Sequence, residues 1–454
     1  MSDTRKPPDS RLIAWQLLDS VLLSEHPLDQ AFAEHGALAR LAARDRAFVR
    51  LLTATTLRRL GQIDDALARL MDKPLKPDLA RLQNLMRLAA AQLLFLQTPP
   101  HAAVSTALDL AQARKFGKFK GLLNAVLRRL GREGEEILAD QDEIALNTPA
   151  WLLRSWAEAY GAETARLIAG ATLKEPPLDL TPRAALEDWI DPLDAALLPT
   201  GSLRLGSGHG DVRRLPGYAE GAWWVQDAAA ALPAKLLQPL QGQRVIDLCA
   251  APGGKTAQLA AAGARVTAVD LYEGRLALVT ENLQRLGLEA ETVAADALDW
   301  RPEEPADAVL LDAPCSATGT LRRHPDIAHI KSAKDVTALA ETQAALLRAA
   351  LEMLKPGGLL VYAVCSLQPE EGPERIQPIL DEGLAQRIAV QPEELLHDGA
   401  RDAAAASGEA CFAEGLDLLR DWITPSGDLR TLPSHFGEIG GIDGFYACRL
   451  RLKA

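Results

Sequence analysis

The sequence predicts a multidomain protein in which an all-α bundle precedes a doubly wound α/β domain. At 454 residues, the chain is too long for one ordinary hydrophobic core. Apolar residues keep helical spacing over residues 11–130, as in the series Leu12, Trp15 and Leu18. From Gln243 onward, short apolar runs alternate with helical stretches, a pattern typical of a parallel sheet covered by helices.

The composition is that of a globular protein, with 48% hydrophobic and 24% charged residues. No uninterrupted apolar stretch is long enough to span a bilayer, and the polar N-terminus does not resemble a signal peptide. Five cysteines are scattered along the chain without metal-ligand spacing. This pattern favours a reducing, cytoplasmic environment and argues against a disulfide framework or a metal site.

A basic segment stands out near the end of the predicted bundle. The net charge of −12 argues mildly against a nucleic-acid partner, but residues 112–132 contain seven basic residues and no acidic one. Such a run is either a solvated helix face or a contact for RNA phosphates. Two more arginines follow Thr320. The candidate RNA-binding residues are Lys115, Lys118, Lys120, Arg128, Arg129, Arg322 and Arg323.

The composition and the apolar spacing change twice in the middle of the chain. Residues 131–142 are acidic and contain glycine, which suggests a linker, and residues 151–171 again show helical spacing. Many Pro and Gly residues over 176–218 indicate a small mixed subdomain. The predicted domains are a helical bundle at 1–132, linker helices with the mixed subdomain at 133–220, and a catalytic domain at 221–454.

The α/β part is expected to contain five parallel strands and a terminal one. The expected strands are 244–249, 265–270, 290–294, 307–312, 358–364 and 445–450, and the expected helices are 255–262, 273–286 and 335–354. In such sheets, ligands bind beyond the carboxyl ends of the strands.

A cofactor loop is expected at residues 247–256, DLCAAPGGKT, between a strand and a helix. Small residues let backbone amides approach a ligand, and Asp270 and Asp296 follow the next strands, where carboxylates suit ribose hydroxyls and an adenine amino group. The loop has neither the G-x-G-x-x-G spacing of a dehydrogenase nor the spacing of a Walker A loop. S-adenosylmethionine, a nucleoside without phosphates, fits best. Cys249 is expected to be a small buried filler.

Two thiols follow two expected strands. Cys315 lies in ADAVLLDAPCSATGT, just after Asp312, and Cys365 lies in VYAVCS. A lone cysteine beside an apolar strand is usually inert packing. Two at strand ends, which share a rim if the strands are neighbours, indicate that at least one is catalytic.

Methylation of pyrimidine C5 is the chemistry that needs a thiolate beside a methyl donor. C5 is a poor nucleophile until a thiolate adds at C6 and turns the ring into an enamine. A free cysteine is mostly protonated at neutral pH, so the site must favour the thiolate. Asp312 is expected to hold the N3/N4 edge of a cytosine that has left its stack.

Several motifs carry a family resemblance. DLCAAPGGKT, DAPCSATGTLRRHPDI and VCSLQPEE resemble those of RNA cytosine-5 methyltransferases. The N-terminal helices, with RDRAFVRLLTATTLRRLGQID, are similar to the NusB-type RNA-binding domain that is fused to them in the bacterial small-subunit (16S) ribosomal RNA branch. This similarity covers nearly the whole chain and implies a Rossmann-like S-adenosylmethionine-dependent domain.

The resemblance also implies site residues. It makes Cys365 the nucleophile and Cys315 the residue that assists product release, with Asp312 between cofactor and base. It implies cofactor contacts at Cys249, Ala250, Ala251, Pro252, Gly253, Gly254, Lys255, Asp270, Asp296 and Asp312. The chain departs from the family pattern at Ala317, Val364 and Gly372, where Gly, Thr and Asn are usual.

The partner implied is ribosomal RNA or its precursor particle, bound by a monomer, without a membrane. Two alternatives stay open: a cytosine-5 methyltransferase that acts on transfer RNA, and a non-catalytic RNA-binding or assembly factor. The intact cofactor loop and both thiols favour an enzyme, and the NusB-like helices weigh against transfer RNA.

Overall fold

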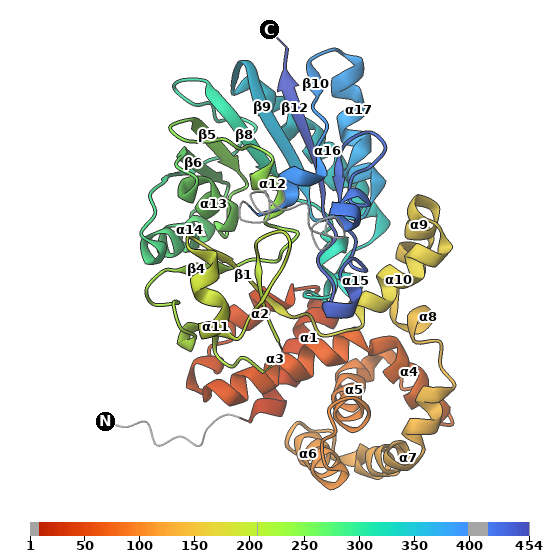
Figure 1. Cartoon of the computed structure of the whole chain (residues 1–454). Helices are drawn as coiled ribbons and strands as arrows, with labels where there is room; N and C mark the ends of the chain where they lie inside the picture. The colour runs from red at the N-terminus through yellow and green to blue at the C-terminus, as the bar shows by residue number, and fades with distance from the viewer. Residues whose placement is uncertain (1–8, 207, 398–415, 454) are drawn as a thin grey trace. The chain divides into compact units, whose positions relative to one another are not determined.

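The computed structural model describes residues 9–206, 208–397 and 416–453 (Figure 1). The chain divides into two compact units. The first comprises Met1–Lys174 and Leu321–Ser332, and the second comprises Glu175–Thr320 and Ala333–Ala454. Cys411, one of the scattered cysteines, lies outside the described residues.

The first unit is helical, as predicted. Its α-helices are α1 (Ser10–Ser24), α2 (Leu28–Glu34), α3 (Ala43–Arg58), α4 (Leu60–Arg69), α5 (Ala80–Leu94), α6 (Pro100–Ala113), α7 (Lys120–Ala139), α8 (Glu143–Asn147), α9 (Ala150–Tyr160), α10 (Ala162–Thr172) and α15 (Ile327–Ile330). The last of these comes from the short segment that follows Thr320.

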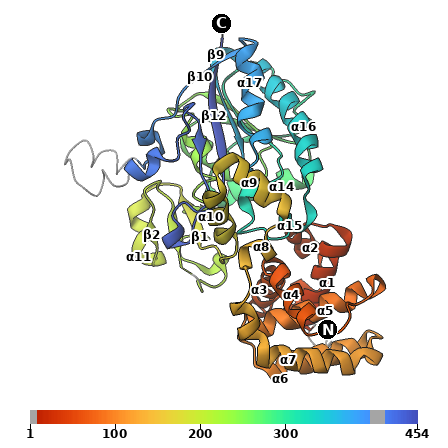
Figure 2. The ribbon, with the colours of Figure 1, turned by 90° about the vertical axis from the view of Figure 1, so that its right-hand side faces the viewer.

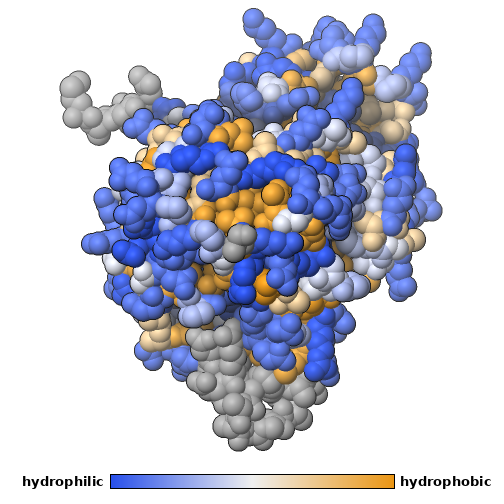
Figure 3. Space-filling view, turned by 90° about the horizontal axis from the view of Figure 1, so that it is seen from above, coloured by the Kyte–Doolittle hydropathy of each residue, from blue (hydrophilic) through white to orange (hydrophobic). Residues whose placement is uncertain are grey.

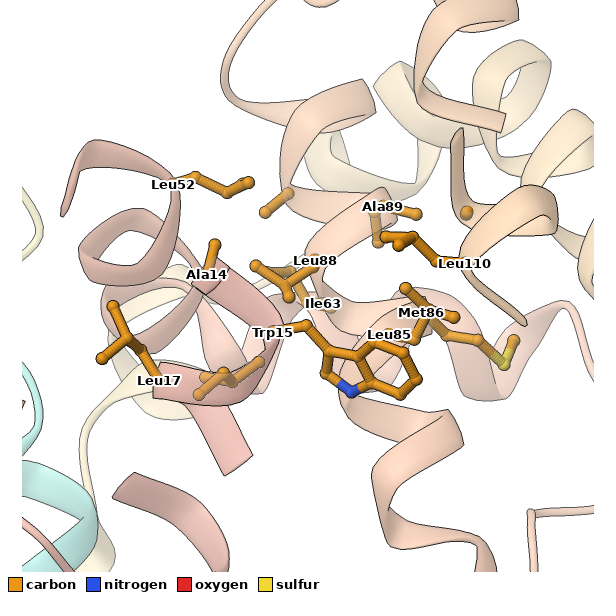
Figure 4. Packing of buried hydrophobic residues seen from close by; sticks show 14 of the residues in the cluster. Ala14, Trp15, Leu17, Leu52, Ile63, Leu85, Met86, Leu88, Ala89 and Leu110 are labelled. Atoms are coloured by element: carbon orange, nitrogen blue, oxygen red, sulfur yellow. The ribbon is translucent and has the colours of Figure 1, made fainter. Parts of the chain in front are cut away.

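Apolar stripes of α1 to α7 form one core. Trp15 of α1 lies beside Leu85, Met86 and Leu88 of α5 (Figure 4), and its indole N–H donates to the carbonyl of Arg81 at 2.8 Å. A tryptophan buried this deeply needs such a partner for its N–H group. The helical spacing seen in the sequence therefore corresponds to burial in the core.

The predicted linker at 131–142 is wrong over most of its length, because α7 continues to Ala139. Glu135, Glu136 and Leu138 are good helix formers. Gly134 lies where a Cβ would come within 2.4 Å of a methyl group of Leu94, so this glycine allows two helices to approach closely and does not mark a turn.

The main sheet of the second unit has seven strands in a row and an eighth strand that pairs with one of them. Its order is β10-β12-β9-β8-β5-β6-β7, and β11 pairs with β12. The strands are β5 (Arg244–Leu248), β6 (Arg265–Asp270), β7 (Glu291–Ala294), β8 (Ala306–Asp312), β9 (Leu354–Val364), β10 (Ala385–Arg387), β11 (Leu429–Arg430) and β12 (Tyr446–Leu452). The five expected parallel strands are present, but β12 is antiparallel to β9, so the sheet is mixed at one edge.

Helices cover both faces of this sheet. They are α12 (Leu232–Lys235), α13 (Gly254–Ala261), α14 (Glu273–Leu286), α16 (Ala333–Glu352) and α17 (Pro373–Asp381). Residues alternate along β8, so Leu310 packs with α12 and α13 while Leu311 packs with α16 and α17. Figure 2 shows α16 and α17 along the same side of the sheet. The Rossmann-like prediction is confirmed.

A second, smaller sheet precedes the main one, with three strands in the predicted mixed subdomain and the fourth just beyond it. Four antiparallel strands run in the order β2-β3-β1-β4, namely β1 (Leu178–Pro182), β2 (Ala196–Leu197), β3 (Leu203–Leu205) and β4 (Trp223–Val225), with helix α11 (Ile190–Leu193). A buried ion pair between Arg204 and Asp179, with nitrogen–oxygen distances of 2.7 Å, joins β3 to β1.

The strand order reverses beside β5. From β5 the chain proceeds to β6 and β7 on one side, then to β8 and β9 on the other, and β5 pairs in parallel with both β6 and β8. Ligands of open α/β sheets bind at such a switch point, beyond the carboxyl ends of the strands.

Most of the surface seen from above is hydrophilic, with apolar residues gathered in a central area (Figure 3). No described helix combines the length and the apolar character needed to cross a membrane. Within the described ranges, no three His, Cys, Asp or Glu side chains are grouped so that they could hold a metal ion.

Candidate active site

The cofactor loop, residues Cys249–Lys255, connects β5 to α13 through an unusual backbone. Cys249 and Gly253 both have positive φ, of 59° and 100°. A Cβ at Gly253 would lie 3.1 Å from a methyl group of Val279 on α14, so glycine suits both the conformation and the close approach. The loop therefore brings the N-terminus of α13 to the switch point of the sheet.

Asp270, at the end of β6, anchors this loop. It is buried, its carboxylate accepts from the backbone N–H of Ala251 at 3.1 Å and of Tyr272 at 3.3 Å, and the Arg275 guanidinium lies 3.6 Å away. Asp296, after β7, is exposed and accepts from the N–H of Leu298 at 2.9 Å. The two predicted carboxylates thus differ, because Asp270 is hydrogen-bonded to the loop, whereas Asp296 faces solvent.

Exposed apolar side chains accompany these carboxylates, and the sequence analysis missed them. Leu271 and Tyr272 follow Asp270, and Leu298 lies two residues after Asp296; they are 54%, 61% and 38% exposed. Apolar side chains beside carboxylates suit the faces and the amino edge of a purine. Their position one or two residues after each of these carboxylates is a signal that the sequence alone contains.

Lys255 and Asp312 connect the cofactor loop to the end of β8. The ammonium nitrogen lies 2.7 Å from Asp312 Oδ2, and it is also 5.0 Å from the ring centre of Phe445. Lys255 is nearly buried, whereas the Asp312 side chain is 30% exposed. The structure brings together two residues that the sequence analysis placed at separate points of the site.

Two further titratable side chains, Asp247 and Cys249, lie where β5 passes into the loop. Burial raises the pKa of Asp247 to about 7, even though the Thr256 hydroxyl donates to it at 2.6 Å. Burial, with the nearby charges of Asp312 and Asp270, raises the pKa of Cys249 to about 12. The Cys249 sulfur is therefore a neutral thiol, which agrees with its expected role as a filler.

The two thiols at the ends of β8 and β9 are in contact. These strands are neighbours, with Asp312 opposite Ala363, and the sulfur atoms of Cys315 and Cys365 lie 3.4 Å apart. Both cysteines are partly exposed. The pKa of the Cys315 thiol is raised well above its usual value, first by its hydrogen bond with Cys365, then by burial and by the charges of Cys365 and Glu371.

A buried carboxylate, Glu371, joins the loops that carry these thiols. It accepts from the N–H of Ser316 at 2.8 Å and from the hydroxyl of Ser366 at 2.5 Å, and the Ser316 hydroxyl and Gln343 also donate to it. The spacing Ser-x-x-x-Glu-Glu after Cys365 is visible in the sequence, but nothing in it indicates that Ser316 and Gln343 meet the same carboxylate.

The departures from the family pattern are accommodated locally. Val364 is fully buried in the apolar core, and Ala317 has a positive φ of 57°, a conformation that a glycine adopts more readily. A Cβ at Gly372 would come within 3.0 Å of the Arg430 guanidinium and 3.2 Å of the Tyr446 ring. A larger side chain at position 372 therefore has no room unless Arg430 or Tyr446 shifts.

The predicted RNA-binding residues fall into two groups. Lys115, Lys118, Arg128 and Arg129 are exposed and Lys120 is half-buried on the stretch from the end of α6 to α7, where Glu133 pairs with Arg129 at 3.0 Å.

Arg322 belongs to the other group, and its prediction needs correction. Its side chain is only 1% exposed, and its carbonyl accepts from the Arg58 guanidinium at 2.9 Å, so it is not placed to meet a phosphate at the surface. The adjacent Arg323 is half-buried.

The fold and the site define an S-adenosylmethionine-dependent methyltransferase. The model of the family "16S rRNA methyltransferase RsmB/F" matches residues 234–450, and the NusB family model matches residues 8–132. With the relatives described next, these matches show that the chain belongs to the family of ribosomal RNA small subunit methyltransferase B. Its cofactor is S-adenosylmethionine.

Curated relatives and solved structures agree with this assignment. Ribosomal RNA small subunit methyltransferase B of Pseudomonas putida is 40% identical over 390 residues, which cover 82% of this chain and 88% of the relative. The Vibrio vulnificus protein of the same name is 36% identical over 396 residues, covering 82% and 90%. The crystal structure of PH0851 matches the fold with a TM-score of 0.71 at 21% identity, over 98% of this chain and all of that one.

Proposed function

We propose that this protein transfers the methyl group of S-adenosylmethionine to C5 of a cytosine in small-subunit (16S) ribosomal RNA, through a covalent bond between Cys365 and C6 of the base. The observation that carries the proposal is the contact between two thiols, 3.4 Å apart, at the strand ends beside Asp312. A fold kept only for RNA binding has no need of this pair.

Cofactor binding is assigned to the Cys249–Lys255 loop together with Asp270, Asp296 and Asp312. These residues suit a nucleoside, because exposed apolar side chains accompany Asp270 and Asp296. When bound, S-adenosylmethionine supplies an electrophilic methyl group. Asp312, which is partly exposed and paired with Lys255, is positioned to meet both the cofactor and the N3/N4 edge of cytosine.

Catalysis then divides between the two thiols. The Cys365 thiolate adds to C6, the resulting enamine uses C5 to take the methyl group, a base removes the C5 proton, and the C6–S bond breaks to restore the C5–C6 double bond and the thiolate. Cys315 is the base. Two of the causes that raise the pKa of Cys315 come from Cys365, and both are lost once that sulfur is bonded to carbon. In the adduct the partly exposed Cys315 can therefore give its proton to solvent, and its thiolate then takes the proton from C5.

Two findings support ribosomal RNA as the substrate. The relatives are named ribosomal RNA small subunit methyltransferase B, and the NusB family model matches residues 8–132. Exposed basic residues on the stretch from the end of α6 into α7 are the proposed phosphate contacts. Transfer RNA remains the second candidate substrate, because the thiol chemistry is the same for either RNA.

Bisulfite sequencing of 16S ribosomal RNA and transfer RNA, from cells with and without this protein, tests the proposal, because 5-methylcytosine resists deamination. One 16S position should lose protection when the protein is absent. Protection lost only in transfer RNA would select the alternative, and no change in either RNA would contradict the enzyme itself.

Variants test the division between the thiols. Cys365→Ala should abolish methyl transfer, because no adduct forms, while cofactor affinity stays unchanged. Cys315→Ala should accumulate a protein–RNA adduct, seen as a shifted band on a denaturing gel. Cys448→Ala, which changes a buried thiol of β12, serves as the control. Activity in Cys365→Ala, or no band with Cys315→Ala, would overturn the assignment.

A further inference from the structure

Glu371 is a fully buried acidic residue in a short 3-10 helix, Pro369–Glu371, just after β9. Neither the proposed adduct nor cofactor binding requires a carboxylate at this place. Burying a charged group is costly unless hydrogen bonds replace its water, so its contacts should explain its presence.

Three of the four contacts of the Glu371 carboxylate come from residues adjacent to the thiols. Ser316, which follows Cys315, donates through its N–H group at 2.8 Å and also through its hydroxyl. Ser366, which follows Cys365, donates through its hydroxyl at 2.5 Å. One carboxylate thus holds the two loops through the residue next to each sulfur.

Glu371 is itself fixed from two sides. The side-chain amide of Gln343, on α16, donates to its Oε1 at 3.1 Å and to the carbonyl of Pro314 at 2.9 Å. The hydroxyl of Tyr362, on β9, donates to the Glu371 carbonyl at 2.6 Å. The Glu371 backbone is therefore held by the sheet, and its carboxylate by a helix that covers the sheet.

A carboxylate suits this place better than an amide. All four polar contacts to the Glu371 side chain are donors, and an ionised carboxylate accepts at both oxygens. A glutamine would turn its NH2 group either toward the Ser316 N–H and the Gln343 amide nitrogen, which cannot accept, or toward the two serine hydroxyls, which would then have to accept instead of donate. Either orientation rearranges the cluster and removes its charge-assisted hydrogen bonds.

We infer that Glu371 is a positioning residue, which keeps the sulfur atoms of Cys315 and Cys365 in contact by holding Ser316 and Ser366 on one carboxylate. Its charge is also one of the causes that keep the pKa of Cys315 high, after the hydrogen bond with Cys365, burial and the charge of Cys365. Glu371 thus favours the proton on Cys315.

The first test measures the thiol pair without any methyl transfer. Phenylarsine oxide exchanges its oxygen for two sulfur bonds and releases water, so it binds tightly only where two thiols are in reach of one arsenic atom. Glu371→Gln should weaken its binding at least about tenfold, the equivalent of one lost buried hydrogen bond. The control Glu370→Gln changes the exposed neighbour and should bind as wild type does. Cys315→Ala gives the background.

The second test rests on the proposed function and uses methyl transfer to RNA. Glu371→Gln should lower kcat about 100-fold, since small misplacements of reacting groups have effects of this size, while KM for cofactor and RNA stays within about threefold. Ser316→Ala, which removes one hydroxyl from the cluster, should lower kcat by a smaller factor and covers the case in which Glu371→Gln does not fold.

Two results would overturn the inference: wild-type arsenical binding in Glu371→Gln and Ser316→Ala, or wild-type kcat in both. A protein that binds the arsenical as expected but never methylates cytosine would contradict only the proposed function. The positioning role and the enzymatic role therefore fail separately.

Discussion

Two buried carboxyl groups, Asp247 on β5 and Glu371 just after β9, support the two halves of the site in opposite ways. Asp247 lies beneath the cofactor loop with one donor, the Thr256 hydroxyl, and its second oxygen has no partner among the described residues. Glu371 lies behind the thiol loops with four donors. The burial of Asp247 raises its pKa to about 7, so it holds a proton over part of the neutral range.

The cofactor half is the Cys249–Lys255 loop with Asp270, and the thiol half is the two loops that carry Cys315 and Cys365. The difference between the two carboxyl groups shows what determines the shape of each half. The cofactor loop takes its shape from backbone geometry, with positive φ at Cys249 and Gly253 and backbone N–H groups on Asp270. The thiol loops depend on side chains that meet on one carboxylate. Changes to one half should therefore leave the other intact, which the following predictions test.

Gly319→Ala should have the largest effect, on the thiol half alone. A Cβ at Gly319 would lie 2.0 Å from the carbonyl oxygen of Gly444, and the Gly319 N–H donates to the Cys365 carbonyl at 3.0 Å. The clash must move the backbone beside Cys365, the proposed nucleophile. We expect kcat to fall about 100-fold or more, with cofactor affinity, measured by calorimetry, within about threefold.

Gly121→Ala is the matched control for that variant, because nothing lies within 4 Å of a Cβ placed there. A loss of cofactor affinity in Gly319→Ala as large as the loss of kcat would show that the two halves are not independent.

Asp270→Asn should affect the cofactor half instead. The amide keeps one acceptor for the N–H groups of Ala251 and Tyr272 but loses the charge and the second acceptor. We expect the Kd for S-adenosylmethionine to rise about 10-fold to 50-fold, as for a charged hydrogen bond, with arsenical binding to the thiols unchanged. Asp299→Asn, at an exposed aspartate, is the control. Weaker arsenical binding in Asp270→Asn would contradict the comparison.

The smallest effect concerns Asp247 and pH. Its folded pKa of about 7 is above the ordinary 3.8, so between about pH 4 and pH 7 the folded state holds a proton that the unfolded state has lost. Its contribution to stability is therefore greatest at acidic pH and is lost as the pH rises through 7. Asp247→Asn should flatten the fall of Tm between pH 5 and pH 8 by roughly 2–6 °C, corresponding to about 1–2 kcal/mol. An unchanged profile would mean that Asp247 is ionised throughout.

Much of the fold and the cofactor loop could be predicted from local patterns. Periodic apolar residues gave the helices of the first unit, and short apolar runs gave β5 to β9 within a few residues. The end of β8 at Asp312, together with β9 as its neighbour, brought Cys315 and Cys365 to one rim. These features depend on residues close in sequence or on a rule of topology.

The rest depends on contacts between distant residues. Ser316 and Gln343 reach Glu371 only because β8, β9 and α16 are adjacent. Gly134 looked like a linker residue because its close contact with Leu94 is invisible in the sequence. Arg322 looked like a phosphate contact because a basic residue after a catalytic motif gives no sign of burial.

The segment Leu321–Ser332 has a consequence for the order in which the protein is made. Asp326 accepts from the N–H of Leu28 at 3.0 Å, Arg58 donates to the Arg322 carbonyl, and His329 contacts the Leu57 carbonyl at 2.9 Å. The helical unit begins at the N-terminus, yet these partners lie 264 to 298 residues further along the chain. A nascent chain that has passed Lys174 therefore has most of the helices of this unit but not the packing that completes them, and the chain must be translated as far as Ser332 before the first unit can finish folding.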